Sequence, residues 1–281
     1  MNETITNIPL GELHPFPDHP FGVRDDEAME QTVESIREYG VLVPAIARPR
    51  EDGGYELIAG HRRKHACERA GLETMPVIVR DLDRNAAVII MVDSNIQREN
   101  ILPSERAKAY KMKLEAIKRQ GARHDLTSTQ IAQKLSVEKV AEEAGTSKDQ
   151  VRRYIRLNEL EPQLMQMVDE GKIGMTPAVE ISYLKPEEQK LLIETIDSEQ
   201  ATPSFSQAQR MKRLSQEGKL NDDAMLGIMM EQKKPENWDL KLPMDKIRKY
   251  FPRSYTPQRM EETIIKLLDM WMKKRQRDQQ R

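Results

Sequence analysis

Length, composition and charge restrict the kind of protein that this sequence can encode. The chain has 281 residues, which is enough for two or three domains of roughly 100–150 residues each. Charged residues make up 32% of the chain and aromatic residues 5%, a composition that favours solvated helical modules over one large β-sandwich. The net charge of −1 excludes a polybasic protein, so nucleic acid would have to bind at local clusters of Lys and Arg.

Cysteine usage and hydropathy exclude further classes. The single cysteine, Cys67, excludes an intramolecular disulfide and a zinc site built from cysteines. No apolar run approaches the roughly 18–20 residues that span a bilayer, and the N-terminus lacks the charged-then-apolar pattern of a signal peptide. We therefore expect a cytoplasmic protein without a membrane partner.

The first hundred residues are predicted to form a small mixed α/β domain. One helix is expected at residues 25–40, where apolar residues recur at helical spacing before a glycine, and another begins near Arg62. Short strands are expected at residues 5–13, 41–49, 55–59 and 75–82. Because strands and helices alternate, the fold class expected for the whole chain is α+β, with this unit followed by helices.

From Pro103 to about residue 230 almost every segment is predicted to be helical. Breaks are expected at Gly121, Gly145, 171–174, Pro186 and 202–203. A last helix is expected to begin at Thr256 and Pro257, where Thr caps and Pro fits the first turn. The predicted domains are 1–100, a helical domain at 101–232, a linker at 233–255 and a C-terminal helix at 256–281.

Residues 139–157 carry the pattern of a helix-turn-helix. Ala141, Gly145 and Val151 supply a small packing residue, a turn and a β-branched anchor. Since Gln and Arg read base edges and Lys and Arg neutralise phosphates, this pattern predicts DNA binding. The alternative is an ordinary helical hairpin with a charged, solvated face. The candidate DNA-binding residues are Ser147 (the N-cap of the second helix), Lys148, Gln150, Arg152 and Arg153, with Lys139 and Arg156 as flanking cations.

A second cluster follows the predicted strand at 55–59. Gly60 is followed at once by His61, Arg62, Arg63 and Lys64. Cations are unfavourable in the first turn of a helix because the helix dipole is positive there, so the cluster predicts a bound anion such as a phosphate. The alternative is an amphipathic helix whose cations face solvent. A metal site on the two histidines of this helix is not expected, since no third ligand accompanies them.

A third polar cluster lies at residues 93–100. Its Asn and carboxylates suit a divalent ion held against a phosphate chain, with Arg98 adding positive charge. The alternative is a polar loop that leaves a buried helix.

Together these stretches resemble the ParB family of DNA-partition proteins. "LIAGHRRKHACERAG" (57–71) is similar to the family's Gly-Glu-Arg-Arg box, and "SNIQRENILPSERAKAY" (94–110) to its Glu-Asn-x-Gln-Arg box. The helix-turn-helix stands where the family has its own, and the resemblance covers roughly residues 5–220. It implies an N-terminal ParB/sulfiredoxin-like domain that binds CTP with Mg²⁺, a domain that recognises a palindromic centromere-like DNA site, and a homodimer that closes as a clamp on the nucleoid.

The resemblance also assigns residues. The implied nucleotide-binding residues are Gly60, His61, Arg62, Arg63, Asn95, Gln97 and Arg98, and Asn95 is also the implied Mg²⁺ ligand. His61 and Ser94 stand where the family carries Glu. Because a carboxylate beside the metal is lost, we expect CTP hydrolysis to be slow or absent.

The sequence and the family resemblance also predict partners and roles for this chain. The apolar stripe from Met260 to Trp271 predicts a homodimer, because reading a palindrome needs two-fold symmetry. The alternative is that the stripe docks on the chain's own helical domain. A ParA-type ATPase is a possible partner, although the chain shows no long basic segment before its first strand. The first alternative is a ParB-like transcriptional regulator or nucleoid-occlusion factor. A sulfiredoxin-like phosphotransferase is less favoured, because Gly60 stands where sulfiredoxin needs Cys.

Overall fold

The structure is a computed structural model that describes residues 4–98, 100–122, 129–231, 247–252 and 254–279. The chain divides into two compact units, residues 1–231 and 232–281. The linker predicted at 233–255 falls largely on residues 232–246, outside the described residues.

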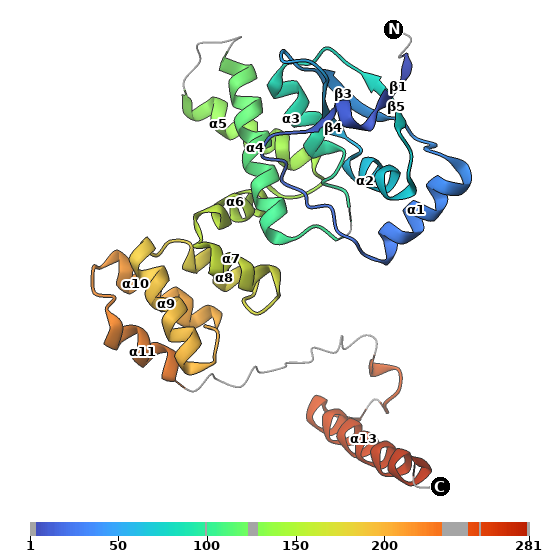
Figure 1. The fold of residues 1–281 in the computed structure, drawn as a ribbon. Helices are drawn as coiled ribbons and strands as arrows, with labels where there is room; N and C mark the ends of the chain where they lie inside the picture. The colour runs from blue at the N-terminus through green and yellow to red at the C-terminus, as the bar shows by residue number, and fades with distance from the viewer. Residues whose placement is uncertain (1–3, 99, 123–128, 232–246, 253, 280–281) are drawn as a thin grey trace. The chain divides into compact units, whose positions relative to one another are not determined.

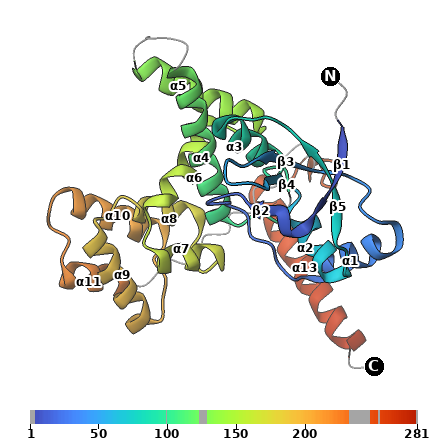
Figure 2. The same ribbon diagram turned by 45° about the horizontal axis from the view of Figure 1, so that its top comes forward.

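A five-stranded mixed sheet forms the centre of the N-terminal part (Figures 1 and 2). Its strands are β1 (Ile5–Pro9), β2 (Leu13–Pro15), β3 (Ala45–Pro49), β4 (Tyr55–Ala59) and β5 (Thr74–Val79). In the order β1-β5-β3-β4-β2, the pairs β1–β5 and β3–β4 are antiparallel, and β3–β5 and β2–β4 are parallel.

Three of the predicted strands differ from the observed ones, and the one expected at 75–82 is observed at Thr74–Val79. The strand expected at 5–13 is split by a 3₁₀ turn at Leu10–Glu12, which carries the chain from one edge of the sheet to the other. The strand expected at 41–49 begins only at Ala45. Pro44, which precedes it, has no N–H to donate to a neighbouring strand.

Helices cover both faces of this sheet. Helices α1 (Glu27–Tyr39) and α2 (His61–Ala70) pack together against one face (Figure 2), and α3 (Arg84–Asp93) packs against the other. Successive strand residues alternate between the two layers: Leu57 is buried with α1 and α2, whereas Ile58 is buried with α3. The helix expected to stop at Gly40 does so.

The rest of the first unit is helical. Its helices are α4 (Pro103–Ala122), α5 (Thr129–Glu143), α6 (Lys148–Arg156), α7 (Pro162–Asp169), α8 (Met175–Ile181), α9 (Pro186–Glu199), α10 (Phe205–Gln216) and α11 (Asp222–Met230). The break expected at Gly121 is wrong, because α4 continues through it to Ala122. The expected fold class, a mixed α/β unit followed by helices, is confirmed.

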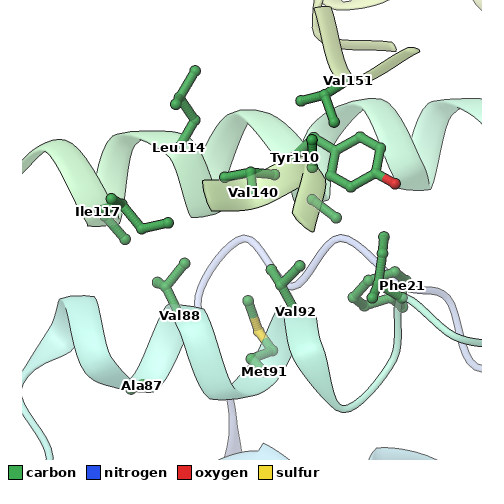
Figure 3. Packing of buried hydrophobic residues seen from close by; sticks show 14 of the residues in the cluster. Phe21, Ala87, Val88, Met91, Val92, Tyr110, Leu114, Ile117, Val140 and Val151 are labelled. Atoms are coloured by element: carbon green, nitrogen blue, oxygen red, sulfur yellow. The ribbon is translucent and has the colours of Figure 1, made fainter. Parts of the chain in front are cut away.

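One hydrophobic core joins the sheet to the first of these helices. Figure 3 shows Val88, Met91 and Val92 of α3 facing Tyr110 and Leu114 of α4. Val140 of α5 and Val151 of α6 belong to the same cluster. The segment that follows α3 and the helices α5 and α6 are therefore held by one packed core. A second cluster holds α7 to α11 together.

The second unit contains one long helix, α13 (Pro257–Gln279), and Thr256 caps it by accepting the Arg259 N–H at 3.4 Å. Several of its large apolar side chains are more than half exposed in this chain, namely Ile265, Leu267, Leu268, Met270, Trp271 and Met272. Among the residues that the structure describes, no helix is both long and apolar enough to cross a membrane.

Candidate nucleotide pocket and DNA-recognition helix

The turn from β4 into α2 requires a glycine. Gly60 caps the helix with φ at 114°, a conformation that side chains disfavour. A Cβ atom at this position would lie 2.8 Å from the Cβ of Ala45. The chain therefore enters α2 with its backbone close against β3.

The cations in the first turn of α2 already have protein partners. Arg62 pairs with Asp26 at 3.3 Å. Arg63 donates to the carbonyl of Pro44 at 2.8 Å and to that of Val43, and Lys64 pairs with a glutamate one turn along α2. These carboxylates and carbonyls offset the helix dipole without an external anion. The anion site expected from the sequence therefore stays a prediction.

A cavity of about 120 Å³ opens beside this turn, and it is called the α2 cavity below. It brings together two motifs that are distant in sequence, since its lining includes Gly60, His61, Arg62 and Arg63 from the first motif and Ser94, Asn95 and Arg98 from the second. An adjoining cavity of about 320 Å³ shares Arg62 and Arg98 with it. The two together reach the roughly 300–1,000 Å³ of typical ligand sites, which the first alone does not.

The charge of the α2 cavity is positive. Burial lowers the pKa of the Arg63 guanidinium, and burial and then Arg62 lower the pKa of Arg98. Arginine remains a cation at neutral pH despite such shifts. Among the described residues, the side chains that line the cavity include no carboxylate, although Asp26 and Glu105 line the adjoining one.

Asn95 presents an oxygen rather than its nitrogen. Its Nδ2 donates to the carbonyl of Met91 at 2.8 Å and to Ser94 Oγ at 3.1 Å, which leaves Oδ1 as an available acceptor. In the described part of the chain, no three His, Cys, Asp or Glu side chains gather as a metal-binding group.

Two residue placements differ from the expectation for the nucleotide site. Gln97 does not line the α2 cavity; it lines a third cavity, of about 400 Å³, beside α6. The α2 cavity also includes a loop to which the sequence assigned no site residue, with His19, Phe21 and Gly22. Phe21 is 4% exposed and belongs to the core that contains α3. The local sequence contains a signal for this loop, because a histidine and an aromatic residue flank Pro20.

The helix-turn-helix is formed by α5 and α6. Gly145 makes the turn with φ at 63°, and Ser147 Oγ accepts the Gln150 N–H at 3.1 Å, as expected of an N-cap. Val151 is fully buried, so α6 turns its opposite side to solvent.

The exposed side of α6 is basic but locally compensated. Lys148 lies 3.5 Å from Glu138, and Arg152 lies 3.4 Å from Asp149. Arg153 is exposed and makes no ion pair with the described residues. Gln150 is half-buried and lines the cavity beside α6. These four side chains are presented by one helix, in contrast to the α2 cavity.

Arg156, which the sequence suggested as a flanking DNA contact, has an internal role. Its Nη2 donates to the carbonyl of Ser182 at 2.7 Å, and its guanidinium lies 4.2 Å from the ring centroid of Tyr183. The side chain therefore ties α6 to the turn after α8, and the interpretation as a flanking cation is wrong.

A buried ammonium connects the two regions. Lys113 of α4 is 1% exposed, and its Nζ contacts a carboxylate oxygen of Asp93 at the end of α3. The same Nζ lies 2.6 Å from Glu143 at the end of α5. One cation thus joins the helix before the Asn95 segment to the first helix of the helix-turn-helix.

The comparisons with known proteins identify two family domains along this chain. The family model for the ParB N-terminal domain matches residues 1–96, and the model for the ParB HTH domain matches residues 99–216. A chromosome-partitioning protein Spo0J from Thermus thermophilus is 34% identical over 185 residues, which are 66% of this chain and 62% of the relative. A nucleoid occlusion protein from Halalkalibacterium halodurans is 31% identical over 197 residues, 69% of this chain and 64% of the relative.

The chain thus covers less than two thirds of these relatives. Among solved structures, a C-terminally truncated ParB from Caulobacter crescentus is similar in two forms. The form complexed to the centromeric parS site is 26% identical, covers 74% of this chain and 98% of that one, and has a TM-score of 0.45. The form complexed with CTP-gamma-S is 30% identical, covers 67% and 96%, and has a TM-score of 0.32. With both domain models matched in order along most of its length, the chain belongs to the ParB family.

Proposed function

We propose that this chain is a partition protein that binds a centromere-like palindromic DNA site and uses CTP to gate a clamp on that DNA. The observation that carries the proposal is the pairing of two sites on one core. A positive cavity lies at α2, an exposed basic helix lies at α6, and the same hydrophobic cluster and Lys113 connect their supporting helices.

DNA binding is assigned to α6. A recognition helix places the residues near its N-terminus against base edges in the major groove. Gln150 suits bidentate contacts to adenine, and Arg153 suits guanine or a phosphate. Lys148 and Arg152 would exchange their present carboxylate partners for phosphates on binding, and Ser147 holds the helix start.

Nucleotide binding is assigned to the α2 cavity. Arg62, Arg63 and Arg98 supply the cations that a triphosphate needs, and Gly60 lets the ligand approach the backbone at the start of α2. The choice of CTP rests on the family resemblance. Mg²⁺ commonly takes few protein ligands beside phosphate oxygens and water, which fits the single free oxygen of Asn95.

Turnover of the bound nucleotide is proposed to be slow or absent. No carboxylate lines the α2 cavity within the described residues, and His61 and Ser94 occupy the positions where the family carries Glu. Among the described residues, the α2 cavity therefore supplies no carboxylate that would orient an attacking water.

The clamp requires a dimer, which we assign to α13. The exposed apolar side chains on this helix, such as Leu268 and Trp271, are of the kind that a second copy would cover. A ParA-type ATPase is the further partner that a role in partition requires, and the nucleoid is where such a protein would act.

Selection from a pool of random DNA duplexes tests the DNA assignment. The full chain should enrich one palindrome, and enrichment of no sequence would contradict it. Chromatin immunoprecipitation in the source organism then separates the roles. For a clamp, the protein is expected to spread along the DNA around a few sites. Isolated promoter peaks would favour a transcriptional regulator, and many dispersed sites would favour occlusion, a role named for the 31% identical relative.

A further inference from the structure

Two histidines are stacked in the α2 cavity. The rings of His19 and His61 lie 3.9 Å apart between centroids, at 43° to each other. Both residues line the cavity. The Nε2 atom of each is buried and has no hydrogen-bond partner in the part of the chain that the structure describes. Buried polar atoms are normally paired, so two unpaired nitrogens in one cavity suggest that their partner is a ligand.

The hydrogen bonds of His19 fix where its proton lies. Its Nδ1 is 2.8 Å from the carbonyl oxygen of Phe21, and a carbonyl only accepts, so Nδ1 carries the hydrogen. In neutral His19 the Nε2 atom is therefore a bare acceptor. A phosphate oxygen is also an acceptor, so the two would repel each other until Nε2 gains a proton.

Burial, together with the surrounding cations, keeps the pair neutral in the free protein. Helix α2 contributes Arg62, Arg63 and Lys64, the segment after α3 contributes Arg98, and α4 contributes Lys108 and the opposing carboxylate of Glu105. Burial lowers the pKa of His61 to about 3, with His19, Lys64 and Arg98 adding to the effect. Burial also lowers the pKa of His19.

A polyphosphate reverses this balance, because its negative charges offset the arginines that disfavour an imidazolium. We propose that His19 and His61 are phosphate-facing residues of the nucleotide site and that the pair takes up one proton from solvent, on a ring Nε2, when the phosphates enter. This inference rests on the proposed nucleotide function. The second ring stays neutral, since two imidazolium charges in stacked rings repel.

The sign of the pH dependence follows from this exchange. The bound state holds a proton that the free state lacks, so affinity rises as the pH falls through the bound-state pKa of the pair. Linkage by one proton changes the dissociation constant by at most about tenfold per pH unit. Between pH 8 and pH 6 the affinity for CTP is therefore expected to increase, over and above the ligand's own titration.

Calorimetry of CTP binding in buffers with different ionisation enthalpies counts the protons directly. The nucleotide's terminal phosphate itself titrates near about pH 6, so the readout is the difference between the wild type and variants. The double variant His19→Gln/His61→Gln should lose the extra uptake of about one proton, because a single variant leaves one ring that can still accept it. His65→Gln is the matched control, because His65 also lies on α2 but pairs with Asp25 at 2.8 Å and lines none of these cavities.

Nuclear magnetic resonance gives a second readout, which uses the wild-type protein and does not require a variant to bind CTP. The chain has five histidines, and selective labelling of their ring carbons reports each protonation state. CTP should move a signal of His19 or His61 to its protonated position at neutral pH and leave His65 unchanged. The proposal is overturned if CTP binds without extra proton uptake, or if the uptake persists in the double variant. Absence of any binding heat would instead overturn the nucleotide function itself.

Discussion

The α2 cavity and the exposed side of α6 both gather cations, but they are assembled in opposite ways. The cavity takes its side chains from a loop near residue 20, from the start of α2 and from the segment after α3. The α6 surface takes them from one helix of nine residues. In the cavity, Arg63 donates to backbone carbonyls and Arg62 pairs with Asp26 of another segment, whereas the cations Lys148 and Arg152 on α6 pair with exposed carboxylates.

This difference predicts how each region responds to change. A site assembled from distant segments depends on the core that holds them, while a site on one helix depends mainly on that helix. The two regions depend on each other through Lys113 and the shared hydrophobic core. The following experiments test whether a variant disturbs one region or both, beginning with the largest expected effect.

Lys113→Met should disturb both regions at once. It leaves the carboxylates of Asp93 and Glu143 facing each other without their shared cation. Removing one partner of a fully buried pair costs about 3–5 kcal/mol, and since both carboxylates are partly exposed we expect about 2–4 kcal/mol of unfolding free energy. Urea unfolding measures it. Lys139→Met, on an exposed cation 4.0 Å from Glu143, is the control and should cost little.

Arg63→Ala should affect the cavity alone. Loss of a charge-assisted contact to the ligand is worth about 2–3 kcal/mol, or roughly 30- to 150-fold in the CTP dissociation constant. DNA affinity without nucleotide should not change. Arg69→Ala is the control, because Arg69 is on the same helix but pairs with Asp25 and Glu30 outside the cavity. Unchanged calorimetric affinity in the Arg63 variant would place the phosphates elsewhere.

Gln150→Ala and Arg153→Ala should affect the α6 surface alone. Each is expected to cost about 1–3 kcal/mol on the selected DNA site and to relax its specificity. Fluorescence anisotropy with the selected and a scrambled duplex measures both quantities. Lys172→Ala removes an exposed cation that pairs with Glu170, away from α6, and should behave as wild type. Equal loss on both duplexes would mean that these residues contact only phosphates.

Ser147→Ala should give the smallest effect, about 1 kcal/mol of unfolding free energy, because it removes the N-cap of α6. Ser147→Asn keeps an acceptor for the Gln150 N–H and should retain most of that stability. If only the alanine variant also loses DNA affinity, positioning of α6 by its cap contributes to recognition. Thermal unfolding and anisotropy on the same samples make the comparison.

The sequence predicted the α6 region almost completely, because every determinant lies within one short stretch. Helical spacing, the turn at Gly145 and the cap at Ser147 are local properties, and each appears in the structure. Arg156 was misassigned because its partners, Ser182 and Tyr183, come from a turn that local patterns do not bring close.

The α2 cavity was predicted only in part. Two motifs identified Arg63, Asn95 and Arg98, but the approach of the loop containing His19 depends on the burial of Phe21 in a core shared with α3. That contact is tertiary and leaves no periodic signal. Gln97 was assigned to the nucleotide site, but it lines the cavity beside α6. It lies two positions after Asn95, where the helix has ended, so its side chain points into a different cavity.

Arg98 has a consequence for how ligands in this chain influence each other. It lines the α2 cavity, the adjoining cavity and the cavity beside α6. Because one guanidinium lines three neighbouring cavities, a ligand that draws Arg98 into one cavity withdraws it from the other two. Because binding linkage is reciprocal, a nucleotide that recruits Arg98 must change the affinity of any anion held beside α6 by the same factor in both directions.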